Sequence, residues 1–552
     1  MLSRLSLAVL LVSTAAAAQP TPVTPPTIGS ANTATADPAV SRPKTTPCRA
    51  RLFTDMKFAD FSSKSFAYAP PAACPGPWQK VVLEADYSVE AGRQFDRTAT
   101  LWIGGVNVYF GTTAEPSRKV ARAWHIERDL TEYAALLKVP SQGRAELGNL
   151  VNGTYTSSLW GTAQIAFYPA SKDADDSGPA IADLVLPLSG SATGGTVALF
   201  DPSAELSATF RLPRNVERAY LDVILQHQGA NDEFWYTCVP THLAGELQSC
   251  AGTAFREGQL SIDGQPAGVV PIFPWIFTGG VDPYFWRPIP APQSLNFVPY
   301  RVDVTPFAGV LSDGQPHRFA IKVTNNTQYF STTATLLLYV DHGSTEVTGA
   351  VTQNTIGTPA PVVNEELNRD RTPGTTIGTV TTTSSRQFVL AGWVKTSHGR
   401  VRTEVAQTID FSNVQQFVSP QSLPETFVQN ILQSTAISST TKVQGGSRSG
   451  ETSVRMSWPL EMDLTVNIDQ SGGFVSQIGK VKQAYNRVDS SGDFASLLSN
   501  SGEWADTYPT QQGQSGSQRF FFSDSEHHCF SRALSAAGGV LTSIVEGKGC
   551  DD

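Results

Sequence analysis

The sequence carries little charge: only 16% of its 552 residues are Asp, Glu, Lys or Arg, and the net charge is −9 at pH 7. Phosphate binding needs dense Lys and Arg on one face, so this acidic balance argues against nucleic acid as a partner. After the N-terminal segment there is no run of about eighteen apolar residues, so we expect no membrane anchor. Long segments with a helical apolar period are nearly absent too, which indicates little helix.

Two common kinds of catalytic site are also missing from the sequence. No Gly-x-Ser-x-Gly segment presents a nucleophilic serine, so hydrolysis through an acyl-enzyme has no support. There is no Cys-x-x-Cys pair, and His527 and His528 beside Cys529 do not have the spacing of a complete zinc site. We therefore expect neither a metal nor another cofactor.

The N-terminus predicts export. Arg4 supplies a positive start, residues 5–12 form an apolar run too short to span a bilayer, and residues 16–18 are small, as at a cleavage site. We expect a signal peptide at 1–18, a flexible Pro- and Thr-rich linker at 19–46, and a secreted or periplasmic protein.

The six cysteines fall into three couples that are close in sequence, and an oxidising compartment favours disulfide bonds. We expect Cys48–Cys74, Cys238–Cys250 and Cys529–Cys550 to pair. Other connectivities stay open, because spacing alone does not determine pairing.

Short strands separated by turn residues recur along the chain and predict an all-β protein. The few helical candidates are short, at residues 131–138 and 494–500. Residues 97–105 line up with 256–264, and 128–131 with 302–305, an internal similarity short enough to arise by chance. Taken as a repeat, it predicts two tandem jelly-roll β-sandwich domains followed by a C-terminal β-rich accessory domain. We place these three domains at 47–170, 196–342 and 343–552, with a linker at 171–195.

Residues 231–236, Asn-Asp-Glu-Phe-Trp-Tyr, set Asp232 and Glu233 against three aromatic side chains just beyond the apolar run 219–225. Aromatic neighbours partly desolvate a carboxylate and favour its protonated form, which suits a general acid. A polar loop with an aromatic plug is an equally good interpretation of the same residues.

Asp96 lies between Arg93 and Arg97 at the start of a predicted strand. Two neighbouring cations should keep the pKa of this carboxyl low, and an ionised carboxylate suits a base or a group that positions water. The alternative is a surface ion pair.

Several blocks in order resemble the peptide N-glycanase A family of plants, fungi and bacteria. The resemblance covers residues 47–340 and rests on rare residues at 92–97, 101–106, 113–116, 214–216, 231–236, 254–257, 262–264, 276–280 and 285–288. It implies hydrolysis of the amide between asparagine and the innermost N-acetylglucosamine of an N-glycan, leaving a glycosylamine and an aspartate peptide. It also implies acid activity, tolerance of core α1,3-fucose, no metal, and N-glycosylated peptides or denatured glycoproteins as substrates. We expect a monomer.

The peptide N-glycosidase F family is more distantly similar. Its catalytic aspartate lies in Trp-Asp-Arg at a strand start, which residues 95–97, Phe-Asp-Arg, resemble. Its two glutamates find no match, since the aligned positions are Gly252 and Asn149. Either Glu233 or Glu257 replaces them from another position, or the chemistry differs.

We therefore expect Asp96 to activate water, Glu233 to protonate the leaving nitrogen, and Arg97, with Arg256, to hold the carbonyl oxygen. The other candidates for substrate binding are Asp232, Trp235, Glu257, Glu115, Asp282 and Trp286. Gly279 and Gly280 predict a turn in close approach to the cleft, or a plain hairpin turn. Two other classes remain open: a glycan-binding protein without catalysis, and a glycoside hydrolase with two carboxylates.

Overall fold

The computed structural model describes residues 23–170, 181–229, 231–370, 374–446, 449–547 and 549–550. The expected signal peptide, 1–18, and residues 171–180 of the expected linker lie outside these ranges. The predicted all-β fold is confirmed: strands β1 to β29 make up most of the described chain, and the α-helix α1 spans only Ala308–Leu311. No helix in the described ranges is long and apolar enough to cross a membrane.

The first β-sandwich packs two four-stranded antiparallel sheets, of order β1-β8-β3-β6 and β2-β7-β4-β5. Apolar side chains from both sheets, such as Phe53 and Phe66 with ring centroids 5.6 Å apart, form its core. Its strands are β1 (Cys48–Phe58), β2 (Lys64–Tyr68), β3 (Trp78–Val89), β4 (Thr98–Ile103), β5 (Val106–Thr112), β6 (Arg122–Asp129), β7 (Ser141–Leu147) and β8 (Leu159–Pro169).

The second β-sandwich repeats this plan, with sheets of order β10-β17-β12-β15 and β11-β16-β13-β14. Each strand of the first sandwich corresponds to the strand nine places later, so the internal similarity seen in the sequence follows the topology. Its strands are β10 (Val197–Leu199), β11 (Leu206–Arg211), β12 (Val216–Gln228), β13 (Glu257–Ile262), β14 (Gln265–Pro271), β15 (Tyr300–Asp303), β16 (Pro316–Thr324) and β17 (Tyr329–Val340), and β9 (Leu184–Leu188) pairs with β17.

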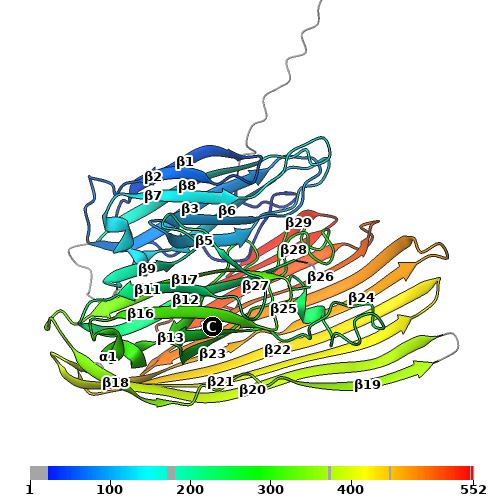
Figure 1. Cartoon of the computed structure of the whole chain (residues 1–552). Helices are drawn as coiled ribbons and strands as arrows, with labels where there is room; N and C mark the ends of the chain where they lie inside the picture. Colours follow the sequence, from blue (N-terminus) through cyan, green and yellow to red (C-terminus); the bar gives the residue numbers. More distant parts are fainter. Residues whose placement is uncertain are drawn as a thin grey trace, which may run out of the picture.

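The rest of the chain forms one twelve-stranded antiparallel sheet of long strands, which underlies the second sandwich (Figure 1). The sheet and the second sandwich share one apolar core. Its strands are β18 (Thr348–Asn354), β19 (Val362–Asp370), β20 (Thr375–Thr396), β21 (Gly399–Pro420), β22 (Glu425–Gln444), β23 (Gly450–Ser457), β24 (Leu460–Ile468), β25 (Phe474–Ser491), β26 (Phe494–Tyr508), β27 (Ser515–Asp524), β28 (Cys529–Ala537) and β29 (Val540–Glu546).

Strand β26 shows how this sheet reaches the second sandwich. Alternate residues of a strand share a face, and Trp504, Asp506 and Tyr508 point at one loop, residues 279–288. The Trp504 ring lies 5.0 Å from that of Trp286, and the Tyr508 ring lies 5.4 Å from that of Tyr284. The C-terminal sheet therefore packs directly against this loop of the second sandwich.

Three sequence predictions can be checked directly. All three expected disulfides are present. Residues 494–500, expected as a helix, belong to strand β26, because pairing with β25 and β27 overrides their local helical preference. Residues 23–46, expected as a flexible linker, instead contact the folded body: Ala34 N donates to Pro288 O at 3.0 Å, and Ala36 N to Gln518 Oε1 at 2.7 Å.

Candidate active site

Asp96 and Glu115 are brought to one point by the β4–β5 hairpin. Thr98 pairs with Thr112 in this hairpin, and the pairing continues as Thr113 N donates to Arg97 O at 2.8 Å. Asp96 just precedes the first strand and Glu115 just follows the second, so both carboxyl groups lie at the same end of the hairpin. This juxtaposition depends on strand register, which the separation of the two residues in sequence does not reveal.

Gly279 of the second sandwich closes over the two carboxyl groups. A methyl group placed on Gly279 would overlap both Asp96 Oδ1 and Glu115 Oε2, so these two oxygens lie no more than about 5 Å apart. The loop is fastened to the first sandwich where Thr278 Oγ1 donates to Thr113 O at 2.6 Å. Gly279 is therefore a point of close approach between the two sandwiches, as the sequence suggested.

Glu233 follows strand β12 of the second sandwich and adds a third carboxyl group. Burial raises its pKa to about 7, and the negative charge of Asp96 contributes to the rise. The same two causes raise the pKa of Glu115 to about 8. Two glutamates therefore stay protonated at mildly acidic pH beside one aspartate.

The pKa of Asp96 is raised, contrary to the prediction from its two arginines. Burial is the largest cause and outweighs the attraction of Arg97 and the backbone amide of Gly279, which both stabilise the anion. Arg97 is itself half-buried, and burial lowers its pKa. The negative charge of Asp96 raises the pKa of both glutamates, whereas neither glutamate is among the causes that shift the pKa of Asp96, so Asp96 is the group of the three best suited to carry the negative charge.

Two arginines lie beside the carboxyl groups. Arg97 Nη2 donates to Gln94 Oε1 at 2.8 Å, while its buried Nε has no protein partner. Arg287 Nη2 lies 3.7 Å from Glu115 Oε1 and donates to Pro116 O at 3.1 Å. Arg97 was predicted; Arg287 was missed, and its only signal was the rare block Phe-Trp-Arg-Pro at 285–288.

Asp232 and Arg256, predicted to contact substrate, form an internal ion pair instead. Arg256 Nε donates to Asp232 Oδ1 at 2.9 Å, and neither side chain has any exposed surface. Asp232 also accepts the backbone amides of Thr327 and Gln328 at 2.8 and 2.6 Å. The pair thus holds the chain segment that carries Glu233, and it presents nothing to a substrate.

The two tryptophans predicted to bind substrate belong to the core. Trp235 is 1% exposed and packs on Phe411 of the C-terminal sheet, with ring centroids 6.1 Å apart. Trp286 is 3% exposed, packs on Trp504, and donates from Nε1 to Gly280 O at 2.9 Å. The sheet that covers both rings could not be anticipated from their local sequence.

Glu257 and Asp282 also face the C-terminal sheet. Glu257 is buried and forms an ion pair with Arg386 of β20. Asp282 is buried against Asp506 of β26, and burial with this second carboxyl group raises the pKa of Asp282 to about 7. Of the ten predicted site residues, the structure brings together four: Asp96, Arg97, Glu115 and Glu233.

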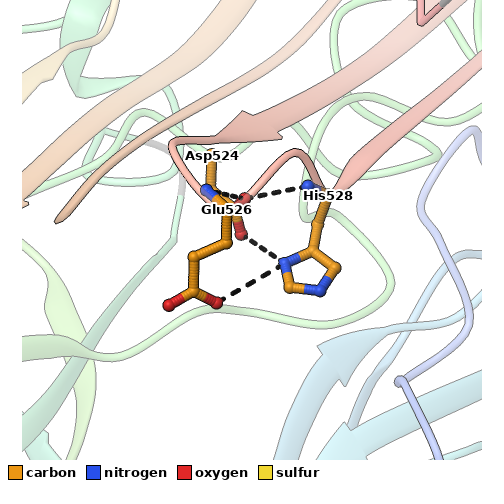
Figure 2. Close-up of side chains that lie close together, drawn as sticks. All are labelled: Asp524, Glu526 and His528. Carbon is orange, nitrogen blue, oxygen red and sulfur yellow. Dashed lines mark hydrogen bonds and ion pairs between the residues drawn. The ribbon is translucent and has the colours of Figure 1, made fainter.

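A separate group of potential ligand atoms occurs at the turn between β27 and β28, where Asp524, Glu526 and His528 lie within 4.8 Å of one another (Figure 2). Asp524 Oδ1 accepts the backbone amides of Glu526 and His528 at 3.0 and 2.9 Å, and Oδ2 contacts His528 Nδ1 at 2.9 Å. These bonds are those of an Asp-stabilised turn, and they account for the grouping.

Comparisons with known proteins agree on one family. A family model described as peptide N-acetyl-beta-D-glucosaminyl asparaginase amidase A matches residues 38–356. The chain is 34% identical over 417 residues to peptide-N4-(N-acetyl-beta-glucosaminyl)asparagine amidase A of Prunus dulcis. This match covers 72% of this chain and 71% of the Prunus dulcis protein.

Two solved structures show a weaker likeness. PNGase F of Flavobacterium meningosepticum is 14% identical with a TM-score of 0.36, over 53% of this chain and 96% of that one. PNGF-II is 14% identical with a TM-score of 0.35, over 54% of this chain and 66% of that one. We draw no conclusion from likenesses this low.

Proposed function

The chain belongs to the peptide N-glycanase A family, and we propose that it hydrolyses the asparagine side-chain amide to the innermost N-acetylglucosamine of N-glycopeptides. The observation that carries this proposal is the meeting of Asp96 and Glu115 at Gly279, with Glu233 beside them. Amide hydrolysis needs a base for water and an acid for the departing nitrogen, and this cluster offers both.

In the proposed mechanism the Asp96 carboxylate accepts a proton from a water molecule as the water oxygen attacks the amide carbon. The carbonyl oxygen gains negative charge, and in this proposal the positive charge of Arg97, half-buried beside Asp96, stabilises it. Glu233, protonated near neutral pH, then gives its proton to the nitrogen as the carbon–nitrogen bond breaks. The products are an aspartate peptide and the intact glycan as a glycosylamine.

Glu115 has a different role in this proposal. Its pKa of about 8 keeps it protonated through the acidic range, so it can donate a hydrogen bond to Asp96 or to substrate. Arg287, 3.7 Å away, holds it in place. Glu115, which the sequence suggested only as a substrate contact, is therefore one of the three carboxyl groups of the proposed site.

The proposal extends to several finer properties of the enzyme, each with its own support. An acid that titrates near pH 7 supports activity under mildly acidic conditions. Tolerance of core α1,3-fucose is carried over with the family resemblance. Export is supported by three disulfide bonds, which persist in oxidising compartments. We further propose denatured or short glycopeptides as the substrates and a monomeric enzyme.

Product analysis tests the reaction class. After incubation of the mature chain with a defined N-glycopeptide, mass spectrometry should find intact glycan and a peptide heavier by about one mass unit than its unglycosylated asparagine form. A glycoside hydrolase, whose two carboxylates can also lie at about 5 Å, would leave sugar on an unchanged asparagine. Binding without turnover would instead support the glycan-binding alternative.

A further inference from the structure

An aromatic row leads from the carboxyl cluster onto the C-terminal sheet. Arg287, beside Glu115, has its guanidinium carbon 4.6 Å from the ring centroid of Tyr284. The Tyr284 ring lies 5.4 Å from that of Tyr508, and the Tyr508 ring 5.8 Å from that of Phe474. Three rings, one from the loop of residues 279–288 and two from strands β26 and β25, therefore follow one another outward from the site.

These rings are open to solvent, unlike the buried tryptophans of the site. Phe474 is 49% exposed, and Tyr284 and Tyr508 are half-buried. The three rings adjoin one another and form a contiguous, partly exposed aromatic surface, and it is contiguous surfaces of this kind that mark sites of contact.

The row is held in place by bonds between the loop and the sheet. Gln477 Nε2 of β25 donates to Val281 O at 2.9 Å, and Gln514 Nε2 donates to Tyr284 O at 3.2 Å. Tyr508 is on the face of β26 that also carries Trp504 against the loop. The fold therefore fixes the position of the three rings relative to Glu115 before substrate binds.

We propose that Tyr284, Tyr508 and Phe474, here called the aromatic row, bind the outer sugars of the N-glycan while its innermost sugar lies at the carboxyl groups. This rests on the proposed amidase function. Sugar rings have apolar C–H faces that pack on aromatic rings, and the hydroxyl groups of the row's two tyrosines can form hydrogen bonds with sugar hydroxyl groups. The chain thereby gives its C-terminal sheet a role in substrate recognition.

The peptide portion of the substrate is the competing occupant, and a second aromatic surface suits it better. Phe95 and Tyr155, with ring centroids 5.3 Å apart, lie beside Asp96 on the first sandwich. The guanidinium carbon of Arg93 lies 5.6 Å from the centroid of the Tyr155 ring, and that of Arg97 lies 6.0 Å from the centroid of the Phe95 ring. Phe95 and Tyr155 flank Asp96, the group proposed to direct water at the amide carbon of the peptide, whereas the aromatic row begins beside Glu115 and leads away onto the C-terminal sheet.

The test compares KM for two forms of one glycopeptide: one with a full branched glycan and one trimmed to its two innermost N-acetylglucosamines. For Tyr508→Ala and Phe474→Ala we expect KM for the full glycan to rise about three- to tenfold, with kcat unchanged and no change for the trimmed form. Free glycan should inhibit the wild-type chain more strongly than either variant.

Phe494→Ala is the matched control, since Phe494 is a 37% exposed phenylalanine at the opposite end of β26. Equal KM increases for both substrates, or none for the full glycan, would overturn the proposal. If the Tyr508 variant does not fold, Phe474→Ala alone decides, because its side chain is largely exposed. Failure of the amidase function is distinguishable, because the wild-type chain would then release glycan from neither form.

Discussion

Asp96 Oδ1 and Glu115 Oε2 lie no more than about 5 Å apart, and both occupy the space that a side chain at Gly279 would need. The two carboxyl groups come from the ends of one hairpin in the first sandwich, while the glycine comes from the second. The site therefore exists only when both sandwiches and the loop of residues 279–288 are correctly placed.

Gly279→Ala should damage the site more than the fold. The added methyl group would overlap both carboxylate oxygens and displace them, and small misplacements of catalytic groups cost about a hundredfold in rate. We expect kcat/KM to fall by at least about tenfold with a small change in melting temperature. Gly357→Ala is the control, because its added methyl group would meet no atom within 4 Å; a comparable loss of activity there would refute the explanation.

The pH dependence of kcat/KM should follow Glu233. A general acid works only while protonated, and the pKa of Glu233 is raised to about 7, so activity should fall as pH rises through about 7. Glu233→Gln should lower activity by about 10²–10⁴-fold and remove this limb from the residual profile. A profile that keeps the limb in the variant would assign the acid to another group, with Glu115 the next candidate.

Asp282 and Asp506 should make stability depend on pH. The pKa of Asp282 in the folded chain, about 7, lies above its value in the unfolded chain. The proton on this carboxyl group therefore stabilises the folded chain fully below the unfolded pKa, and this stabilisation is lost as pH rises through about 7. We expect the melting temperature to decrease between pH 5 and pH 8. Asp506→Asn should flatten this decrease; an unchanged slope in thermal melts of the variant would contradict the assignment.

The buried pair of Asp232 and Arg256 should matter for stability and not for chemistry. Removing one partner of a fully buried pair leaves an uncompensated charge and costs about 3–5 kcal/mol. Arg256→Ala should therefore unfold at much lower denaturant concentration, whereas Arg318→Ala, which removes an arginine with a 44% exposed side chain, should change little. If Arg256→Ala kept full stability but lost activity, the residue would belong to the substrate site after all.

Much of the architecture could be predicted from the sequence. Strand alternation, cysteine spacing and the internal similarity between residues 97–105 and 256–264 can each be seen within short segments. Asp96 and Glu233 became candidates because each lies beside a predicted strand with unusual neighbours, and Asp96 also because Phe-Asp-Arg at 95–97 resembles a catalytic motif. The pKa of Asp96 was predicted in the wrong direction, because its neighbours in sequence are cations while its burial depends on the second sandwich.

Other errors share one physical origin. Trp235 and Trp286 resemble exposed sugar-binding residues in sequence, yet the twelve-stranded sheet covers both, and no local pattern reports contact with a strand more than 150 residues away. The closeness of Glu115 to Asp96 follows from the register of the β4–β5 hairpin, which their separation in sequence does not reveal. Arg287 gained its role only through the same fold-dependent contact with Glu115.

The most direct test of the account is the turnover of a defined N-glycopeptide by Asp96→Asn, measured by mass spectrometry of the peptide product beside the wild-type chain. Asparagine keeps the size of the side chain but cannot accept the proton from water. We predict a loss of at least about 10²-fold in kcat with KM and melting temperature nearly unchanged. A variant that converts asparagine to aspartate at the wild-type rate would contradict the assignment of Asp96 as the base and, with it, the active site described above.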